Sequence, residues 1–285
     1  MFLNQKLLAA TLMTTVVGVA VSTPAQAQLD VTQNSNGIQL LNSLLGNIDG
    51  LSNFAVNLFG NPNAFGTFDG GTFGIESGVV LSTGSVVDLE GPNDRDNTES
   101  IFQTPGLPGE PNTNDGAILQ ITFDADVTAQ QIGFDYIFGS EEFPEFAGTE
   151  YNDLFKLTLN GVNLAKLTNG DDVTINNLTP SGDPASWSPD YINNVGGITT
   201  NDTELDGYTK ALGFLGDLKL GTNILEIQIA DTNDWSFDSA VFLKGGSITS
   251  DPTDPVAVPE PALMLGLGAV AAGLLVQKYS RKETT

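Results

Sequence analysis

Leu225-Glu226-Ile227-Gln228-Ile229 is the stretch that decides the fold, because apolar and polar side chains alternate through it without interruption. Phe155-Lys156-Leu157-Thr158-Leu159 has the same pattern earlier in the chain. A period of two places successive side chains on opposite faces of a β-strand, so that one face is buried and the other meets water. Both stretches therefore predict strands of sheets that pack against another layer through one face.

Shorter segments of similar character recur along the chain, bounded by Gly, Asn, Asp and Pro. The predicted strands are 77–82, 117–123, 131–138, 154–159, 172–175, 223–230 and 239–243. Asn160-Gly161, directly after the strand 154–159, predicts a tight hairpin. No segment between the strands resembles a helix of crossover length, which disfavours a parallel α/β sheet.

One helical pattern precedes the strands, where Ile38, Leu41, Leu44 and Leu45 follow the spacing of a short amphipathic helix. We therefore predict an all-β fold. The expected architecture is a two-sheet antiparallel β-sandwich, jelly-roll-like, with one short N-terminal helix. The proline-containing segment 91–114 is expected to form a long surface loop.

The composition excludes several kinds of chemistry. The chain has no cysteine and no histidine, so disulfides, thiolate metal sites and a serine triad with a histidine base are ruled out. Thirty-five acidic residues face ten basic ones, a net charge of −25, which repels nucleic acid and anionic lipid and attracts cations. A hydrophobic content of 40% with 16 phenylalanines argues for a packed core rather than disorder.

The first residues have the pattern of a secretory signal peptide. Lys6 precedes the apolar run 7–21, and Ala25-Gln26-Ala27 provides a small-residue cleavage site. We therefore predict a signal peptide over 1–27, cleaved between Ala27 and Gln28, and hence handling by the export machinery.

The last 28 residues combine a proline-rich break, an apolar run and a basic tip. The run 262–276 is predicted as a transmembrane helix of about 22 Å. That is shorter than a hydrocarbon core of about 30 Å, so it suits processing better than permanent anchoring. The break and the tip contain Pro259, Glu260, Pro261, Arg281 and Lys282. With these residues the order resembles the bacterial PEP-CTERM sorting signal, which implies cleavage by a membrane exosortase. An ordinary tail anchor is the alternative.

Three longer stretches stand out: 74–84, 134–146 with Tyr151-Asn152-Asp153, and 229–243. Their order and wording resemble the choice-of-anchor L family of bacterial surface proteins, over about Gln28 to Gly246. The resemblance implies a surface domain whose anchoring varies and which has no established enzymatic activity. The domain organisation expected is a signal peptide 1–27, a domain 28–246, a linker 247–257 and a sorting signal 258–285.

Acidic residues gather where predicted strands meet loops. Because loops at one end of a sandwich cluster in space, and calcium takes six to eight oxygen ligands without needing histidine, we predict a calcium site. Its candidate ligands are Glu141, Glu142, Asp153, Asp231 and Asp238. The alternative is that these residues are solvated loop charges and caps of backbone donors.

A glycoside hydrolase is the competing function, because such an enzyme needs only two carboxylates. Its candidates are Glu141, Glu142, Glu145 and Glu150, with Trp187 and Trp235 as platforms for sugars. We expect instead a non-enzymatic structural or adhesion module, exported to the cell surface or extracellular matrix. Its expected partners are extracellular polysaccharide or surface proteins, and its C-terminal segment would attach it to the membrane at least transiently.

Overall fold

The computed structural model describes residues 28–71, 73–95, 97, 100–200 and 202–250. The predicted signal peptide and the predicted sorting signal lie outside these residues. Within the described ranges, no helix has both the length and the apolar character that crossing a membrane requires.

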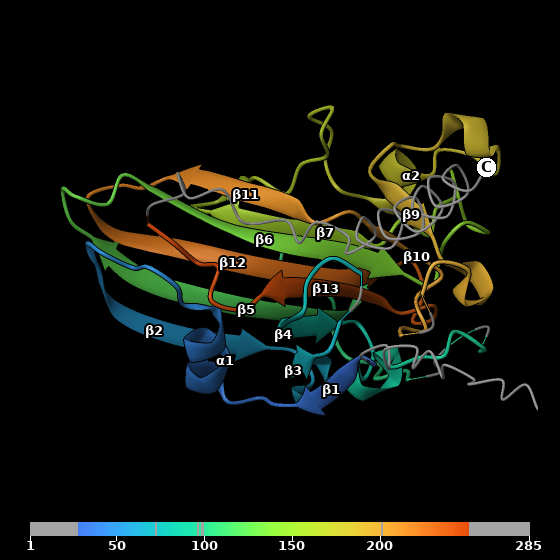
Figure 1. Cartoon of the computed structure of the whole chain (residues 1–285), viewed down its shortest axis with the longest axis horizontal. Helices are drawn as coiled ribbons and strands as arrows, with labels where there is room; N and C mark the ends of the chain where they lie inside the picture. The colour runs from blue at the N-terminus through green and yellow to red at the C-terminus, as the bar shows by residue number, and fades with distance from the viewer. Residues whose placement is uncertain (1–27, 72, 96, 98–99, 201, 251–285) are drawn as a thin grey trace, which may run out of the picture.

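Two antiparallel sheets form the domain, and their long strands lie along the long axis of the molecule (Figure 1). The first sheet has the order β1-β3-β4-β13-β6-β10-β9, with β11 also paired to β6. Its strands are β1 (Asp30–Gln33), β3 (Phe65–Asp69), β4 (Ser77–Ser82), β6 (Gln131–Ser140), β9 (Tyr191–Asn193), β10 (Gly207–Thr209), β11 (Leu212–Asp217) and β13 (Ser239–Lys244).

The second sheet has the order β2-β5-β12-β7-β8. Its strands are β2 (Leu51–Phe59), β5 (Thr113–Ala125), β7 (Leu154–Leu159), β8 (Val162–Asn163) and β12 (Gly221–Thr232). The helical elements are α1 (Gly37–Leu44) and α2 (Ile175–Leu178), with short 3-10 turns η1 (Pro62–Ala64), η2 (Val86–Leu89), η3 (Pro184–Ser186) and η4 (Val195–Gly197).

The main core fills the space between the two sheets. Phe138 of the first sheet stacks on Phe155 of the second, with ring centroids 5.6 Å apart and an interplanar angle of 10°. Tyr136 packs against the same Phe155 ring at 5.3 Å. Helix α1 adds Leu40 and Leu44 to this core. Aromatic side chains thus hold the two layers together over the middle of the sandwich.

A second apolar cluster covers the opposite face of the first sheet. Val80, Ile137 and Phe242 point into it from the central strands β4, β6 and β13. These strands are therefore buried on both faces, which explains why they contain consecutive apolar residues instead of an alternating pattern. Strands β7 and β12 lie in the second sheet and keep the alternation.

The prediction of two antiparallel sheets with one short N-terminal helix is confirmed, whereas the jelly-roll connectivity stays a prediction. Six of the seven predicted strands coincide with or lie within observed ones. The predicted strand 172–175 is wrong, because Ile175 begins α2 and the Thr174 side chain caps this helix by accepting from the Asn177 N–H. An Asx- or Thr-type cap favours a helical turn over an extended segment.

The last described residues belong to the domain, although the sequence placed them in a linker. Ile248 is buried, and its N–H donates to Leu44 while its carbonyl accepts from Gly46, each at 2.9 Å. Thr249 and Gly133 of β6 exchange two backbone hydrogen bonds of 3.0 Å. We call residues 247–250 the C-terminal clasp. It fastens the chain after β13 to α1 and to the beginning of β6.

The predicted hairpin at Asn160-Gly161 is present between β7 and β8, where Leu159 pairs with Val162. Both turn residues have left-handed backbones, with φ values of 53° and 82°. We expect Gly161→Ala to lower the free energy of unfolding by about 1 kcal/mol, because an alanine resists this conformation. Urea unfolding of Gly161→Ala and Gly182→Ala measures this, since an added Cβ meets nothing within 4 Å at either position and only Gly161 has a positive φ. Equal stability of the two variants would contradict the interpretation.

Candidate functional site

Three carboxylates continue the inward-facing rows of the core at one end of the sandwich. On β12 the row Leu225, Ile227, Ile229 is followed two residues later by Asp231, and on β7 Asp153 stands two residues before Phe155. On β6 the row of Phe138 ends at Ser140, and the buried Glu142 follows two residues later in the connection after the strand. Because side chains alternate along a strand, Asp231 occupies a position within β12 that an apolar residue would normally fill, whereas Asp153 and Glu142 are buried just outside the ends of β7 and β6.

The strand register brings these positions together. Ala230 of β12 pairs with Leu154 of β7, which places Asp231 beside Asp153 within the second sheet. In the first sheet Ser239 of β13 pairs with Ser140 of β6, close to Glu142. The Ser239 hydroxyl donates to Asp153 Oδ2 at 2.7 Å and so joins the two sheets. We call the region of Glu142, Asp153 and Asp231 the acidic end.

Burial distinguishes these carboxylates from ordinary surface acids. Glu142, Asp153 and Asp231 each have a relative exposure of 0%. Asp153 accepts from the Thr232 N–H at 3.0 Å and from Ser239. Both carboxylate oxygens of Glu142 and both of Asp231 have no hydrogen-bond partner within the described protein. A buried, unpaired carboxylate costs several kcal/mol, so this end of the domain is unfavourable while its acids are charged.

The pKa values of these carboxyls also show that their charged forms are unfavourable. Burial raises the pKa of Glu142 to about 10, and the neighbouring charges of Asp153 and Asp234 contribute to the rise. Burial also raises the pKa of Asp153, although hydrogen bonds from Ser239 and Thr232 partly oppose it. The pKa of Asp231 lies well above its usual range because of burial, followed by the repulsion from Asp153 and Asp238. The nearby Thr83 hydroxyl, which bonds to Asp238 and Ser239, opposes the rise only in part. At neutral pH the acidic end therefore needs protons or a cation to neutralise it.

The other two predicted ligands are held in different contacts. Glu141 Oε2 accepts from the Asp238 N–H at 3.0 Å, and Asp238 Oδ2 accepts from the Ser100 hydroxyl at 2.7 Å. The close approach needs glycine at position 84, because an added Cβ would lie 1.9 Å from Asp238 Oδ2. Glu141 and Asp238 are therefore near the acidic end but already serve in structural hydrogen bonds.

Asp115 is a buried acid that the sequence analysis missed. Its carboxylate accepts from the backbone N–H groups of Phe102, Gln103 and Thr104, and thereby holds the loop before β5. Its own backbone is left-handed, with φ 45°, where the pairing of β5 with β12 shifts register. The Asn114-Asp115-Gly116 sequence was the available signal for this irregular point in the strand.

The described part of the chain contains no group of three or more acidic side chains that could already hold a metal ion as arranged. The register gathers Glu142, Asp153 and Asp231, but their carboxylates do not form a finished cage. The calcium site expected from the sequence therefore stays a prediction.

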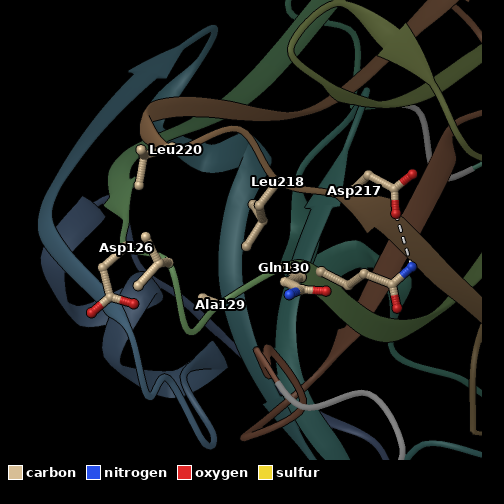
Figure 2. Close-up of a pocket in the computed structure, with 8 residues that line it drawn as sticks. Asp126, Ala129, Gln130, Asp217, Leu218 and Leu220 are labelled. Carbon is tan, nitrogen blue, oxygen red and sulfur yellow. Dashed lines mark hydrogen bonds between the residues drawn. The ribbon is translucent and has the colours of Figure 1, made fainter.

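A pocket of about 650 Å³ lies at the opposite end of the sandwich, between the β5–β6 and β11–β12 connections (Figure 2). Asp126 and Asp217 stand on opposite sides of it in Figure 2. The Thr128 hydroxyl and N–H lower the pKa of Asp126, and Asp217 accepts from Gln131 at 2.8 Å. A glycosidase acid requires a raised pKa, so Asp126 does not suit that role.

The two tryptophans lie in different surroundings. Trp187 donates its Nε1–H to the Ser181 carbonyl at 2.8 Å and packs its ring edge-on against Tyr191. Trp235 is 44% exposed and lies in the loop that follows Asp231. In the adjacent loop, Phe146 packs against Phe237 with centroids 4.9 Å apart. Trp235 is therefore the tryptophan whose ring is open to a ligand.

The candidate hydrolase residues are not brought together as a catalytic pair in an open cleft. Glu145 and Glu150 are exposed, whereas Glu141 and Glu142 are buried. The buried pair faces the interior or an adjacent backbone, where a polymer has no access.

The sequence model of the choice-of-anchor L domain matches residues 26–249. The match ends within the C-terminal clasp and covers both sheets and the acidic end. No curated protein and no solved structure matches the chain.

Proposed function

Because the chain belongs to the choice-of-anchor L family, which indicates an extracellular, surface-associated and non-enzymatic module, we propose that it serves in adhesion or matrix assembly. Its partner would be extracellular polysaccharide or another surface protein. In this proposal an exosortase-type enzyme processes the sorting signal, and the membrane segment attaches the chain at least transiently.

The observation that carries the proposal is the complete burial of the carboxylates at the acidic end. Glu142, Asp153 and Asp231 have exposures of 0%, so a polysaccharide has no access to them. A hydrolase needs two carboxyl groups on either side of a bound sugar. The acids are therefore better suited to holding the domain together than to cleaving a polymer.

Contact with a glycan would involve the loops around the acidic end. Trp235 presents an exposed ring there, and aromatic rings are suited to amphipathic partners because they combine a large apolar face with a polar edge. The negative charge of the chain favours a neutral glycan, or an acidic one bridged by cations, over an unassisted anionic partner.

We expect Trp235→Ala to reduce the fraction of the full chain that sediments with extracted matrix polysaccharide, with an affinity loss of about fivefold for the lost ring contact. Val127→Ala is the matched control, because Val127 is 76% exposed at the opposite end. Equal losses in both variants would contradict a contact at Trp235. Release of sugar fragments during the incubation would support the hydrolase instead.

A further inference from the structure

The unpartnered oxygens of Glu142 and Asp231 are the least satisfied polar groups inside the sandwich. Their side chains are fully buried, and none of the four oxygens accepts a hydrogen bond within the described residues. Buried polar groups are normally paired with protein, water or an ion. These positions therefore point to a ligand that supplies positive charge.

Glu142 follows a strand of the first sheet and Asp231 belongs to a strand of the second. Asp153 is a charge that acts on both Glu142 and Asp231. It lies in the second sheet beside Asp231 and is bound to Ser239 of the first sheet. Asp234 adds one more buried oxygen without a partner, Oδ1, and its charge acts on Glu142 and Asp153. Negative groups from both layers thus converge where the core ends.

We propose that the acidic end binds one calcium ion between the two sheets, with carboxylate ligands from Glu142, Asp153 and Asp231. Asp234 would complete the set from the loop after β12. Calcium accepts carboxylate oxygens in mono- or bidentate fashion and tolerates irregular geometry, so an all-oxygen site without histidine suits it. Binding has to draw the side chains together, since they do not form a closed cage in the structure.

This ligand set differs from the one expected from sequence. Glu141 is left out because its carboxylate already accepts from the Asp238 N–H. Asp238 is left out because its carboxylate already accepts from the Ser100 hydroxyl. Of the two adjacent glutamates expected as ligands only Glu142 is kept, because both of its carboxylate oxygens are buried without a hydrogen-bond partner. The ion would link the end of β6 to β7 and β12 and replace the missing hydrogen bonds by metal–oxygen contacts. The inference is independent of the polysaccharide contact proposed above.

Calorimetric titration of the chelator-treated full chain with CaCl2 at pH 7.5 and 0.15 M NaCl tests the site. We expect one bound ion with a Kd of about 10⁻⁴–10⁻³ M, the range of extracellular calcium modules. Magnesium should bind more weakly because it demands octahedral geometry and keeps its water. At a hundredfold excess of calcium over Kd, Tm should rise by about 5–10 °C. No heat and no shift of Tm between calcium and chelator would overturn the proposal in favour of protonated acids.

Asp231→Asn and Glu142→Gln should each weaken calcium binding by at least about tenfold, because each removes one charged ligand. Asp126→Asn is the matched control, since Asp126 is an acid at the opposite end and should leave Kd unchanged. Near-ultraviolet circular dichroism reports whether each variant folds. Wild-type calcium affinity in both folded variants would overturn the assignment of these ligands. If neither variant folds, the wild-type protein is the test: a rise of Tm with calcium supports the site, and no rise overturns it.

Discussion

Between pH 5 and pH 9 the metal-free protein is expected to become progressively less stable, with Tm falling by on the order of 10 °C. The cause is Glu142, whose pKa is raised from 4.5 to about 10 in the folded state. Between these two values the folded state binds more protons than the unfolded state. Its stabilising proton is fully present below pH 4.5 and is lost as the pH rises toward 10, so the free energy of unfolding falls with rising pH.

The charged groups that act on Glu142 all raise its pKa. Asp153, Asp234, Glu141 and Glu145 each raise its pKa, and burial adds the largest contribution. The contribution of one carboxyl to the free energy of unfolding falls by about 1.4 kcal/mol per pH unit, as long as the carboxyl is protonated in the folded state and charged in the unfolded state. Over four units this gives at most about 5 kcal/mol, which corresponds to the expected change of Tm for a domain of this size.

The composition removes the side chains that normally titrate in this pH range. The chain has no histidine and no cysteine, so no side chain with an ordinary pKa titrates between pH 5 and pH 9. Scanning calorimetry in chelator across this range measures the effect. Glu142→Gln is the control, because it should reduce the slope of the profile to the part contributed by Asp153 and Asp231. A wild-type Tm that is constant or rises with pH would contradict the buried, proton-binding state of the acidic end.

Asp231→Asn is expected to be more stable than the wild type in chelator at pH 8, by about 1–4 kcal/mol, because the buried wild-type carboxyl must take up a proton or keep an unpaired charge at this pH. Asparagine has nearly the same shape as a protonated aspartate and needs no proton from the solvent. The gain should disappear when calcium is added, because only the wild type then acquires the ion. Urea unfolding with and without calcium measures both states.

Asp115→Asn is the matched control for this result. Asp115 is also buried, with an exposure of 2%, but its carboxylate accepts from three backbone N–H groups. Its neutralisation should therefore lower stability by about 1–3 kcal/mol, because charge-assisted hydrogen bonds are weakened. If both variants changed stability in the same direction, the hydrogen-bond partners of a buried aspartate would not explain the effect of neutralising it, and the interpretation would be contradicted.

Much of the fold could be predicted because strands β7 and β12 have one buried and one wet face. Strand β2 was missed, although it pairs along β5, because the left-handed backbone of Asn53 and the register shift between Ser52 and Ala55 break its alternation near the start. Helix α2 was missed because four residues provide too little periodicity, and only the cap at Thr174 marks its start. Local pattern is thus sufficient for long strands and insufficient for short elements whose neighbours are distant in sequence.

The candidate site was predictable in part. Counting in steps of two from Ile229 and from Phe155 would have placed Asp231 and Asp153 inward, and the same count from Phe138 reaches Glu142. The sequence could not assign Glu141 and Asp238, because their hydrogen bonds join segments 97 residues apart. Such contacts depend on the packing of loops, which no periodicity describes.

The C-terminal clasp determines where a mechanical load enters the domain. A force applied through residues beyond Ser250 would act first on Ile248 and on the paired backbones of Thr249 and Gly133. Only after this short attachment peels away would tension reach β13, which is held on both sides by β4 and β6. Under such a load the clasp would therefore detach before tension reaches β13 and the acidic end near its first residue, Ser239.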